Sequence, residues 1–155
     1  MAAQKKFSYQ EQDSKLTLRQ GVAEYFASHP GLLQDGDLDQ VSQQLFHSHD
    51  VCHVMFGLDT TLMDEALADC WTLVGTDVGG PRYYRYLRES KAARDVIRQI
   101  GYGRTLAITI TGLPKITRTL WRAWRMKKKW PWQGYGRYLD ADLWRIRQEF
   151  GIRVL

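Results

Sequence analysis

The chain has 155 residues, of which 44% are apolar and 25% charged. These values are typical of one globular domain and exclude a wholly disordered or fibrous chain. The longest uncharged stretch in the second half, Thr105 to Pro114, is well short of the roughly 20 residues that a membrane-spanning helix needs. The first residues resemble neither a signal peptide nor an Arg-rich transit peptide, which predicts a cytoplasmic protein.

Charge is distributed unevenly along the chain. Residues 1–80 contain 4 basic and 12 acidic side chains, whereas residues 81–155 contain 18 basic and 5 acidic ones. We therefore expect an acidic half that binds a metal or carries catalysis, joined to a half that meets an anionic surface of phospholipid or nucleic acid. Cys52 and Cys70 lack CxxC spacing, so both are expected to be core residues.

Apolar spacing predicts helices throughout the chain. Residues 1–15 are expected to be flexible, and residues 16–155 to form a single all-α domain of about six helices. The first helix is expected over 16–28. The second should end at Gly57 and form a hairpin with a third that runs to about Val74. The candidate N-terminal caps of this pair are Asp35 or Asp37 for the second helix and Asp59, Thr60 or Thr61 for the third.

The second half contains three further predicted helices. One opens at Gly79-Gly80-Pro81 and should continue to residue 100. The β-branched segment 105–111 fits either a helix or an extended linker. A helix over 114–129 should start at its proline, and Asp140 should cap a last helix that ends before Gly151.

Two histidines and two carboxylates can converge on one point of the expected hairpin. His49, Asp50 and His53 fall at about 0°, 100° and 40° around a helix, within one arc of its surface. Glu65 lies at a similar distance beyond the turn and can face the histidines. Two imidazoles with one or two carboxylates suit Zn²⁺, Fe²⁺ or Mn²⁺ and leave coordination positions for water or substrate.

The alternative is that these side chains are exposed or hydrogen-bonded polar residues of an amphipathic hairpin. However, His49 and His53 interrupt an apolar stripe, where polar groups are costly unless they are bonded or coordinated, and this favours the metal site. Asp69, one turn further along, is either an outer partner that orients a histidine or an exposed acid. His47 points away from the arc and His29 precedes a proline, so we expect both on the surface or in a turn.

The histidine motif resembles that of a known family. The segment 49–53 (HDVCH), followed after eleven residues by Glu65, matches the His-Asp-x-x-His-(x)11-Glu signature of the Coq-four family, a coenzyme Q (ubiquinone) biosynthesis family. The ending 138–152 (YLDADLWRIRQEFGI) is similar to that family's C-terminal helix. The resemblance extends from about residue 16 to the end, and the chain looks like a short, bacterial-type member.

The resemblance implies a Coq-four-like helical bundle at the inner face of the membrane. It implies a divalent metal, usually zinc, held by His49, Asp50, His53 and Glu65, with Asp50 and Glu65 as catalytic residues. The implied substrate is a polyprenylated benzoate-type precursor of ubiquinone, whose C1 carboxylate is replaced by hydroxyl in an oxidative decarboxylation. Other ubiquinone-biosynthesis proteins and a second copy of the chain are implied partners. A non-catalytic lipid-binding scaffold for those proteins is the alternative.

The expected helix over 114–129 has separate apolar and cationic faces. Its aromatic and basic side chains favour a helix that lies in an anionic membrane surface. The alternatives are an ordinary solvated basic face and nucleic-acid binding, and the second is disfavoured because no nucleic-acid module is recognised. The candidate lipid contacts are Lys115, Arg118, Leu120, Trp121, Arg122, Trp124 and Arg125.

Two further interpretations remain open from the sequence. A phosphohydrolase of the HD type also uses His-Asp pairs, but it needs additional distant ligands that the remaining histidines are poorly placed to provide. Several aromatic residues could line a channel for a prenyl chain, although they fit the core equally well. These residues are Trp71, Tyr83, Tyr84 and Tyr86.

Overall fold

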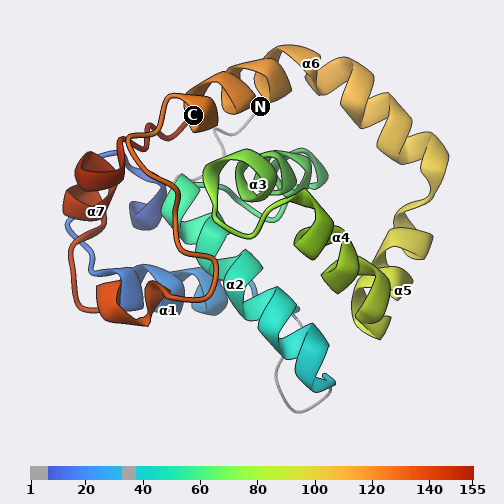
Figure 1. Ribbon diagram of the computed structural model, residues 1–155, viewed down its shortest axis with the longest axis horizontal. Helices are drawn as coiled ribbons and strands as arrows, with labels where there is room; N and C mark the ends of the chain where they lie inside the picture. The colour runs from blue at the N-terminus through green and yellow to red at the C-terminus, as the bar shows by residue number, and fades with distance from the viewer. Residues whose placement is uncertain (1–6, 33–37) are drawn as a thin grey trace.

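The computed structural model describes residues 7–32 and 38–155, apart from the side chains of residues 100, 102 and 104–106 (Figure 1). Within these ranges the chain forms one all-α domain of seven α-helices, with two isolated β-bridges and no strand. The all-α prediction is confirmed, with one helix more than expected. The helices are α1 (Leu18–Ser28), α2 (Gln40–Phe56), α3 (Leu62–Gly75), α4 (Gly80–Glu89), α5 (Lys91–Ile100), α6 (Tyr102–Trp124) and α7 (Leu143–Phe150), with 3₁₀-helices η1 (Ser8–Gln10) and η3 (Tyr135–Tyr138).

Side-chain caps and one glycine set the ends of the α2–α3 hairpin. Asp39 caps α2 through its carboxylate, whereas the predicted caps Asp35 and Asp37 lie outside the described residues. Thr61, one of the predicted caps, accepts a hydrogen bond at the start of α3. Gly57 ends α2 as predicted, with φ of +70°, a conformation that glycine adopts at little cost. The short connection that follows brings the end of α2 beside the start of α3.

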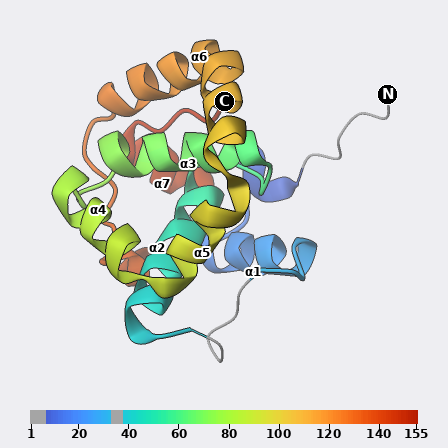
Figure 2. The ribbon, with the colours of Figure 1, turned by 90° about the vertical axis from the view of Figure 1, so that its right-hand side faces the viewer.

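α2 lies at the centre of the domain, in contact with α1, α3 and α4. α6 runs along α3, and Figures 1 and 2 both show its orange C-terminal half on the opposite side of the domain from α1. The rings of Phe56 and Trp71 stack between α2 and α3 with centroids 4.4 Å apart, and Trp130 and Trp132 belong to the same buried hydrophobic core. These aromatic contacts hold the hairpin in place through burial of large apolar surfaces.

The prediction of one continuous helix from residue 81 to residue 100 is wrong. The chain forms α4 and α5 with a break at Ser90. The Ser90 hydroxyl accepts a hydrogen bond from the N–H of Ala93 and also bonds the hydroxyl of Ser42 on α2. A serine that caps a new helix competes with continuation of the old one, and its tertiary partner on α2 favours the break.

The helix predicted to start at Pro114 begins earlier and ends earlier. Residues 105–111 are helical, and α6 continues through Pro114 to Trp124 rather than to residue 129. A proline inside a helix leaves the carbonyl four residues before it without its usual donor. Here that carbonyl belongs to Ile110, which is 65% exposed, so water can satisfy it.

Residues 7–15, part of the segment expected to be flexible, lie against the domain. Tyr9 is fully buried and its hydroxyl donates a hydrogen bond to the carbonyl of Leu58. The backbone N–H of Tyr9 donates to the carboxylate of Glu24 on α1. Burial of an aromatic ring and these bonds to two other elements oppose the chain entropy that would keep this segment mobile.

Arg147 on α7 connects three parts of the chain. Its guanidinium is fully buried and donates to the carbonyls of Val54 and Met55 at the end of α2, and to those of Tyr9 and Glu11 near the N-terminus. Carbonyls in the last turn of a helix have no partner within the helix. Arg147 therefore satisfies the end of α2 next to the hairpin turn.

Candidate metal centre

Three side chains of the hairpin form a cluster that could hold a metal ion. The candidate ligand atoms of His49, His53 and Glu65 all lie within 4.8 Å of one another. The two imidazole rings are 4.8 Å apart between centroids, and the Nε2 atom of His53 lies 3.4 Å from a carboxylate oxygen of Glu65. Three of the four predicted ligands are therefore brought together across the α2–α3 hairpin.

The surroundings of His53 orient its ring and determine which ring nitrogen carries the proton. Its ring is fully buried, and its Nδ1 donates a hydrogen bond to the backbone carbonyl of Asp59, 3.0 Å away. Since a carbonyl only accepts, Nδ1 carries the proton, which leaves Nε2 facing Glu65. This Nε2 is buried and makes no hydrogen bond within the described residues, and its polar neighbour is the Glu65 carboxylate at 3.4 Å. A buried nitrogen of this kind is costly unless it is coordinated, and the donor set suits Zn²⁺, Fe²⁺ or Mn²⁺.

The Asp59 carbonyl that orients His53 lies in the connection between α2 and α3, and His29 holds this connection in place. Nε2 of His29 lies 2.7 Å from the Asp59 carboxylate, and its Nδ1 lies 2.7 Å from the carbonyl of Tyr25. Both ring nitrogens are thus engaged by oxygen acceptors. His29, expected on the surface or in a turn, caps α1 and holds the hairpin connection. Nothing in the sequence distinguishes it from an ordinary turn residue.

The cluster is electrostatically coupled. Burial alone would raise the pKa of Glu65, but its interactions with the imidazoles of His53 and His49 outweigh burial and lower that pKa. Burial alone would lower the pKa of His49, but the Asp69 carboxylate, with Glu65 and Asp50, raises it to about 9. His49 is therefore protonated at neutral pH before a metal binds, and metal binding must displace that proton.

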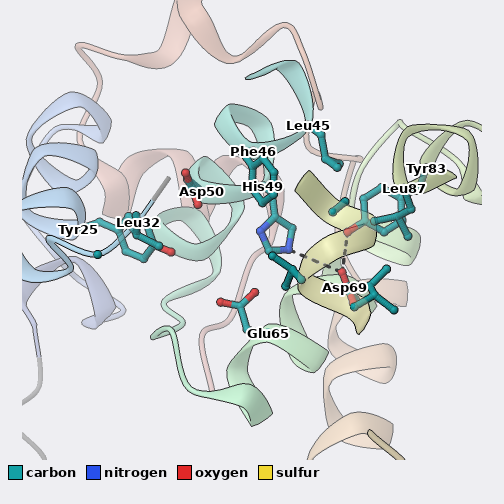
Figure 3. A pocket seen from close by; sticks show the side chains of 14 residues that line it. Tyr25, Leu32, Leu45, Phe46, His49, Asp50, Glu65, Asp69, Tyr83 and Leu87 are labelled. Atoms are coloured by element: carbon teal, nitrogen blue, oxygen red, sulfur yellow. Dashed lines mark hydrogen bonds and ion pairs between the residues drawn. The ribbon is translucent and has the colours of Figure 1, made fainter. Parts of the chain in front are cut away.

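Asp69 combines the two roles left open by the sequence, because it faces His49 while its side chain is 52% exposed. Its carboxylate lies 3.7 Å from Nε2 of His49 and accepts a 2.6 Å hydrogen bond from the hydroxyl of Tyr83 (Figure 3). Burial alone would raise the pKa of Asp69, but its bonds to His49 and Tyr83 lower it. The imidazole of His49 is thus oriented by a carboxylate of α3, which is itself held by a hydroxyl of α4. Outer partners of metal-bound histidines commonly act in this way.

Asp50, the fourth predicted ligand, is not part of the triad. Its side chain is 7% exposed and lies on the far side of His49 from Asp69 (Figure 3). Burial raises the pKa of Asp50 to about 6, against the opposing charges of His49 and His53. The residue is turned by about 100° from His49 on the helix, which directs it toward the α1 side of the site.

Through His49 and Glu65 the cluster borders a largely apolar cavity of about 380 Å³ that is lined by residues of α1 to α5. His49, Asp50, Glu65 and Asp69 form its polar end (Figure 3). Its size and mixed lining are typical of sites for small amphiphilic ligands. The remaining lining residues are Tyr25, Gly31, Leu32, Leu45, Phe46, Tyr83, Leu87, Ala93, Val96 and Ile97.

The aromatic residues suggested for a channel and the two cysteines differ in where they lie and how deeply they are buried. Tyr83 lines the cavity, Trp71 is a buried core residue, and Tyr84 is 67% exposed. Cys52 is buried as predicted, whereas Cys70 is only half-buried. Only Tyr83 among the four aromatic residues suggested for a channel therefore lines the site.

The residues predicted to contact lipid lie at the C-terminal end of α6 and just beyond it. Trp121 and Trp124 are 55% and 74% exposed. Leu120 is half-buried, and the half-buried guanidinium of Arg122 donates to the carbonyl of Val154, so these two side chains are partly engaged in the fold. The exposed basic residues of this segment are Lys115, Arg118 and Arg125.

Comparison with known proteins gives no match to any family model, curated protein or solved structure. In the described part of the chain, no helix combines the length and apolar character needed to span a membrane.

Proposed function

We propose that this chain is a peripheral membrane, metal-dependent protein of ubiquinone biosynthesis. In this proposal it acts at C1 of a polyprenylated benzoate-type precursor and replaces the carboxylate by hydroxyl. The observation that carries the proposal is that two members of the His49, His53 and Glu65 cluster, His49 and Glu65, line an apolar cavity. A substrate with a charged aromatic head and an apolar tail matches both ends of that space.

The residues of the chain have separate roles in this chemistry. His49, His53 and Glu65 would hold the cation, while Asp69 and the carbonyl of Asp59 orient the two imidazoles. A bound divalent cation would stabilise negative charge on the carboxylate or phenolate of the ring. In the net reaction the ring carboxylate would leave as CO₂, a water molecule would supply the hydroxyl oxygen at C1, and O₂ would accept the two electrons and two protons to become hydrogen peroxide. The apolar lining excludes water from the ring and receives the first part of the tail.

An exposed stripe on α6 supports the membrane association. Ile110, Leu113, Trp121 and Trp124 are each at least 55% exposed and fall within about 80° of one another around the helix. Exposed basic residues flank this stripe, in a half of the chain with 18 basic and 5 acidic residues. Apolar and aromatic groups at the centre with cations beside them fit the interface of an anionic bilayer.

The test is complementation of a strain that lacks this decarboxylation step. Glu65→Gln removes a ligand charge at little cost in volume, so we expect accumulation of the prenylated precursor that retains its carboxylate. Wild-type protein and Glu149→Gln, an exposed acid paired only with Lys128, should restore ubiquinone. Mass spectrometry of extracted lipids measures both compounds, and immunoblotting confirms that the variants are present.

The scaffold alternative predicts a different result. If Glu65→Gln is stably expressed and restores normal ubiquinone, the chain contributes by binding lipid or partner proteins rather than by metal-dependent chemistry. If wild-type protein carries no transition metal, the metal-dependent part of the proposal fails. The HD-type phosphohydrolase gains no support, because no other histidine of the described chain joins the triad.

A further inference from the structure

The cavity contains a buried hydroxyl with no partner. Tyr25 on α1 is fully buried, and its Oη makes no hydrogen bond to the described residues. Within the described chain, Tyr25 is the only residue that both lines the cavity and carries such an unpaired buried atom. An unsatisfied buried hydroxyl costs about 1–3 kcal/mol, so its position against the cavity indicates a ligand that completes the hydrogen bond.

The hydroxyl is held rigidly beside the metal cluster. The ring of Tyr25 stacks on His53 at 5.5 Å and contacts the edge of Tyr9 at 5.9 Å. His29 packs against it at 4.9 Å between ring centroids. Figure 3 shows Tyr25 reaching toward the polar end of the cavity from the α1 side, opposite Asp69. Its ring is therefore fixed by three neighbours while its hydroxyl makes no hydrogen bond within the described residues.

The ordinary chemistry of tyrosine makes this hydroxyl a donor. A phenolic hydroxyl titrates at about pH 10, so it carries its proton at neutral pH and can donate a hydrogen bond. A donor beside a cation site is suited to an anionic acceptor, because hydrogen bonds to ionised groups are the strong ones.

We propose that Tyr25 donates a hydrogen bond to one oxygen of a ligand carboxylate whose other oxygen faces the His49, His53 and Glu65 cluster. This inference rests on the proposed function, and it specifies that the substrate enters with its carboxylate toward the hairpin and its tail toward α5. A benzoate has two oxygens for the two anchors, whereas a phenol has one. Tyr25 would therefore select carboxylated rings over rings that have already lost the carboxylate.

The test uses the full chain loaded with Co²⁺ and two probes, 4-butylbenzoate and 4-butylphenol. We expect Tyr25→Phe to retain Co²⁺ and to bind 4-butylbenzoate about tenfold more weakly or worse, as loss of a hydrogen bond to a charged group predicts. Binding of 4-butylphenol should change less than about twofold. Calorimetry gives the affinities, and the visible spectrum of Co²⁺ reports the metal.

Tyr9→Phe is the matched control, because the Tyr9 hydroxyl donates to the carbonyl of Leu58, away from the cavity. It should bind both probes as wild type does. Tyr25→Phe should be at least as resistant to urea as wild type, since it removes an unpaired buried group. A second measurement keeps the hydroxyl in place. With 3-fluorotyrosine incorporated at position 25, the ¹⁹F resonance should shift when 4-butylbenzoate is added.

The outcomes separate this inference from the proposed function. Equal benzoate affinity for Co²⁺-loaded wild type and Tyr25→Phe, equal losses for both probes, or an unmoved ¹⁹F resonance would overturn the role of Tyr25 and leave the metal site standing. Co²⁺-loaded wild type that binds no benzoate would overturn it as well. Absence of bound Co²⁺ in the wild type would instead overturn the proposed function, and this inference with it.

Discussion

At the scale of single residues, His49 has the most consequential electrostatic environment. Burial opposes its protonation, yet the neighbouring Asp69, Glu65 and Asp50 raise its pKa from 6.5 to about 9. The metal-free site thus holds a proton where a metal would bind. Proton and metal compete for the same imidazole. The affinity for the metal should therefore rise with pH, while the stability of the metal-free protein should fall.

We expect the affinity for Zn²⁺ to rise about tenfold per pH unit between about pH 6.5 and 9, where one proton is displaced. The stability of the metal-free protein should fall over the same interval. The folded pKa of His49 lies above the unfolded one, so its contribution is complete below pH 6.5 and lost as the pH rises through about 9. Competition with a chelator and urea unfolding measure the two quantities.

Asp69→Asn supplies the control for this pH dependence. Removing the nearest carboxylate lowers the pKa of His49, so the rise in Zn²⁺ affinity should end at a lower pH than in wild type. A Zn²⁺ affinity that stays constant from pH 6.5 to 9 in the wild type would contradict the role assigned to His49.

At the scale of elements, Arg147 ties α7 to the C-terminus of α2. Burial lowers its pKa to about 10, so it remains charged at neutral pH while it donates to four carbonyls. Two of these carbonyls, those of Val54 and Met55, follow directly after His53. The end of α2 that carries a ligand is therefore stabilised by a helix nearly a hundred residues later in the chain.

Arg147→Met should lower the free energy of unfolding by about 3–5 kcal/mol, because it leaves several buried carbonyls without donors. Arg145→Met is the matched control, since Arg145 is exposed and forms an ion pair with Asp142 one turn earlier. Its loss should cost less than about 1 kcal/mol. Urea unfolding gives both values, and equal stabilities of the two variants would contradict the role of Arg147.

At the scale of the whole molecule, the exposed stripe on α6 and the cavity lie on different elements of one domain. α6 follows α5, which lines the cavity through Val96 and Ile97. Both of these side chains are partly exposed, at 40% and 48%. A membrane contact through α6 would thus place the lipid surface against the helix that directly follows α5, which borders the cavity.

Vesicle co-sedimentation tests this arrangement. With anionic vesicles, Leu113→Asp combined with Trp124→Asp should weaken binding even at low salt, because the apolar contact is lost. Arg118→Glu with Arg125→Glu should weaken it mainly at low salt, since salt screens exposed charges over about 8–10 Å. Wild type should keep part of its binding at high salt.

Two variants control for general effects on the surface. Tyr84→Asp replaces an exposed aromatic residue on α4, and Arg145→Glu reverses an exposed charge on α7. Neither should change vesicle binding. Vesicle binding that is unaffected by the Leu113 and Trp124 substitutions, or a preference for nucleic acid in a gel-shift assay, would exclude α6 as the membrane contact.

Much of the α2–α3 hairpin was predictable because local chemistry decides it. The positive φ at Gly57 and the capping hydroxyl of Thr61 act over a few residues, and helical periodicity places His49 and His53 on one arc. With the two helix ends known, Glu65 is constrained to face the histidines. All-α architecture and three members of the cluster therefore follow from patterns that are local in the sequence.

The remaining features depend on contacts between segments far apart in the chain. The break at Ser90 involves the hydroxyl of Ser42, and the fully buried Arg147 finds its partners on α2 and near the N-terminus. Tyr25 reaches the site only because α1 lies against α2. Burial and pairing of polar groups are properties of the assembled core, so periodicity identifies the candidate ligands while tertiary structure alone decides what surrounds them.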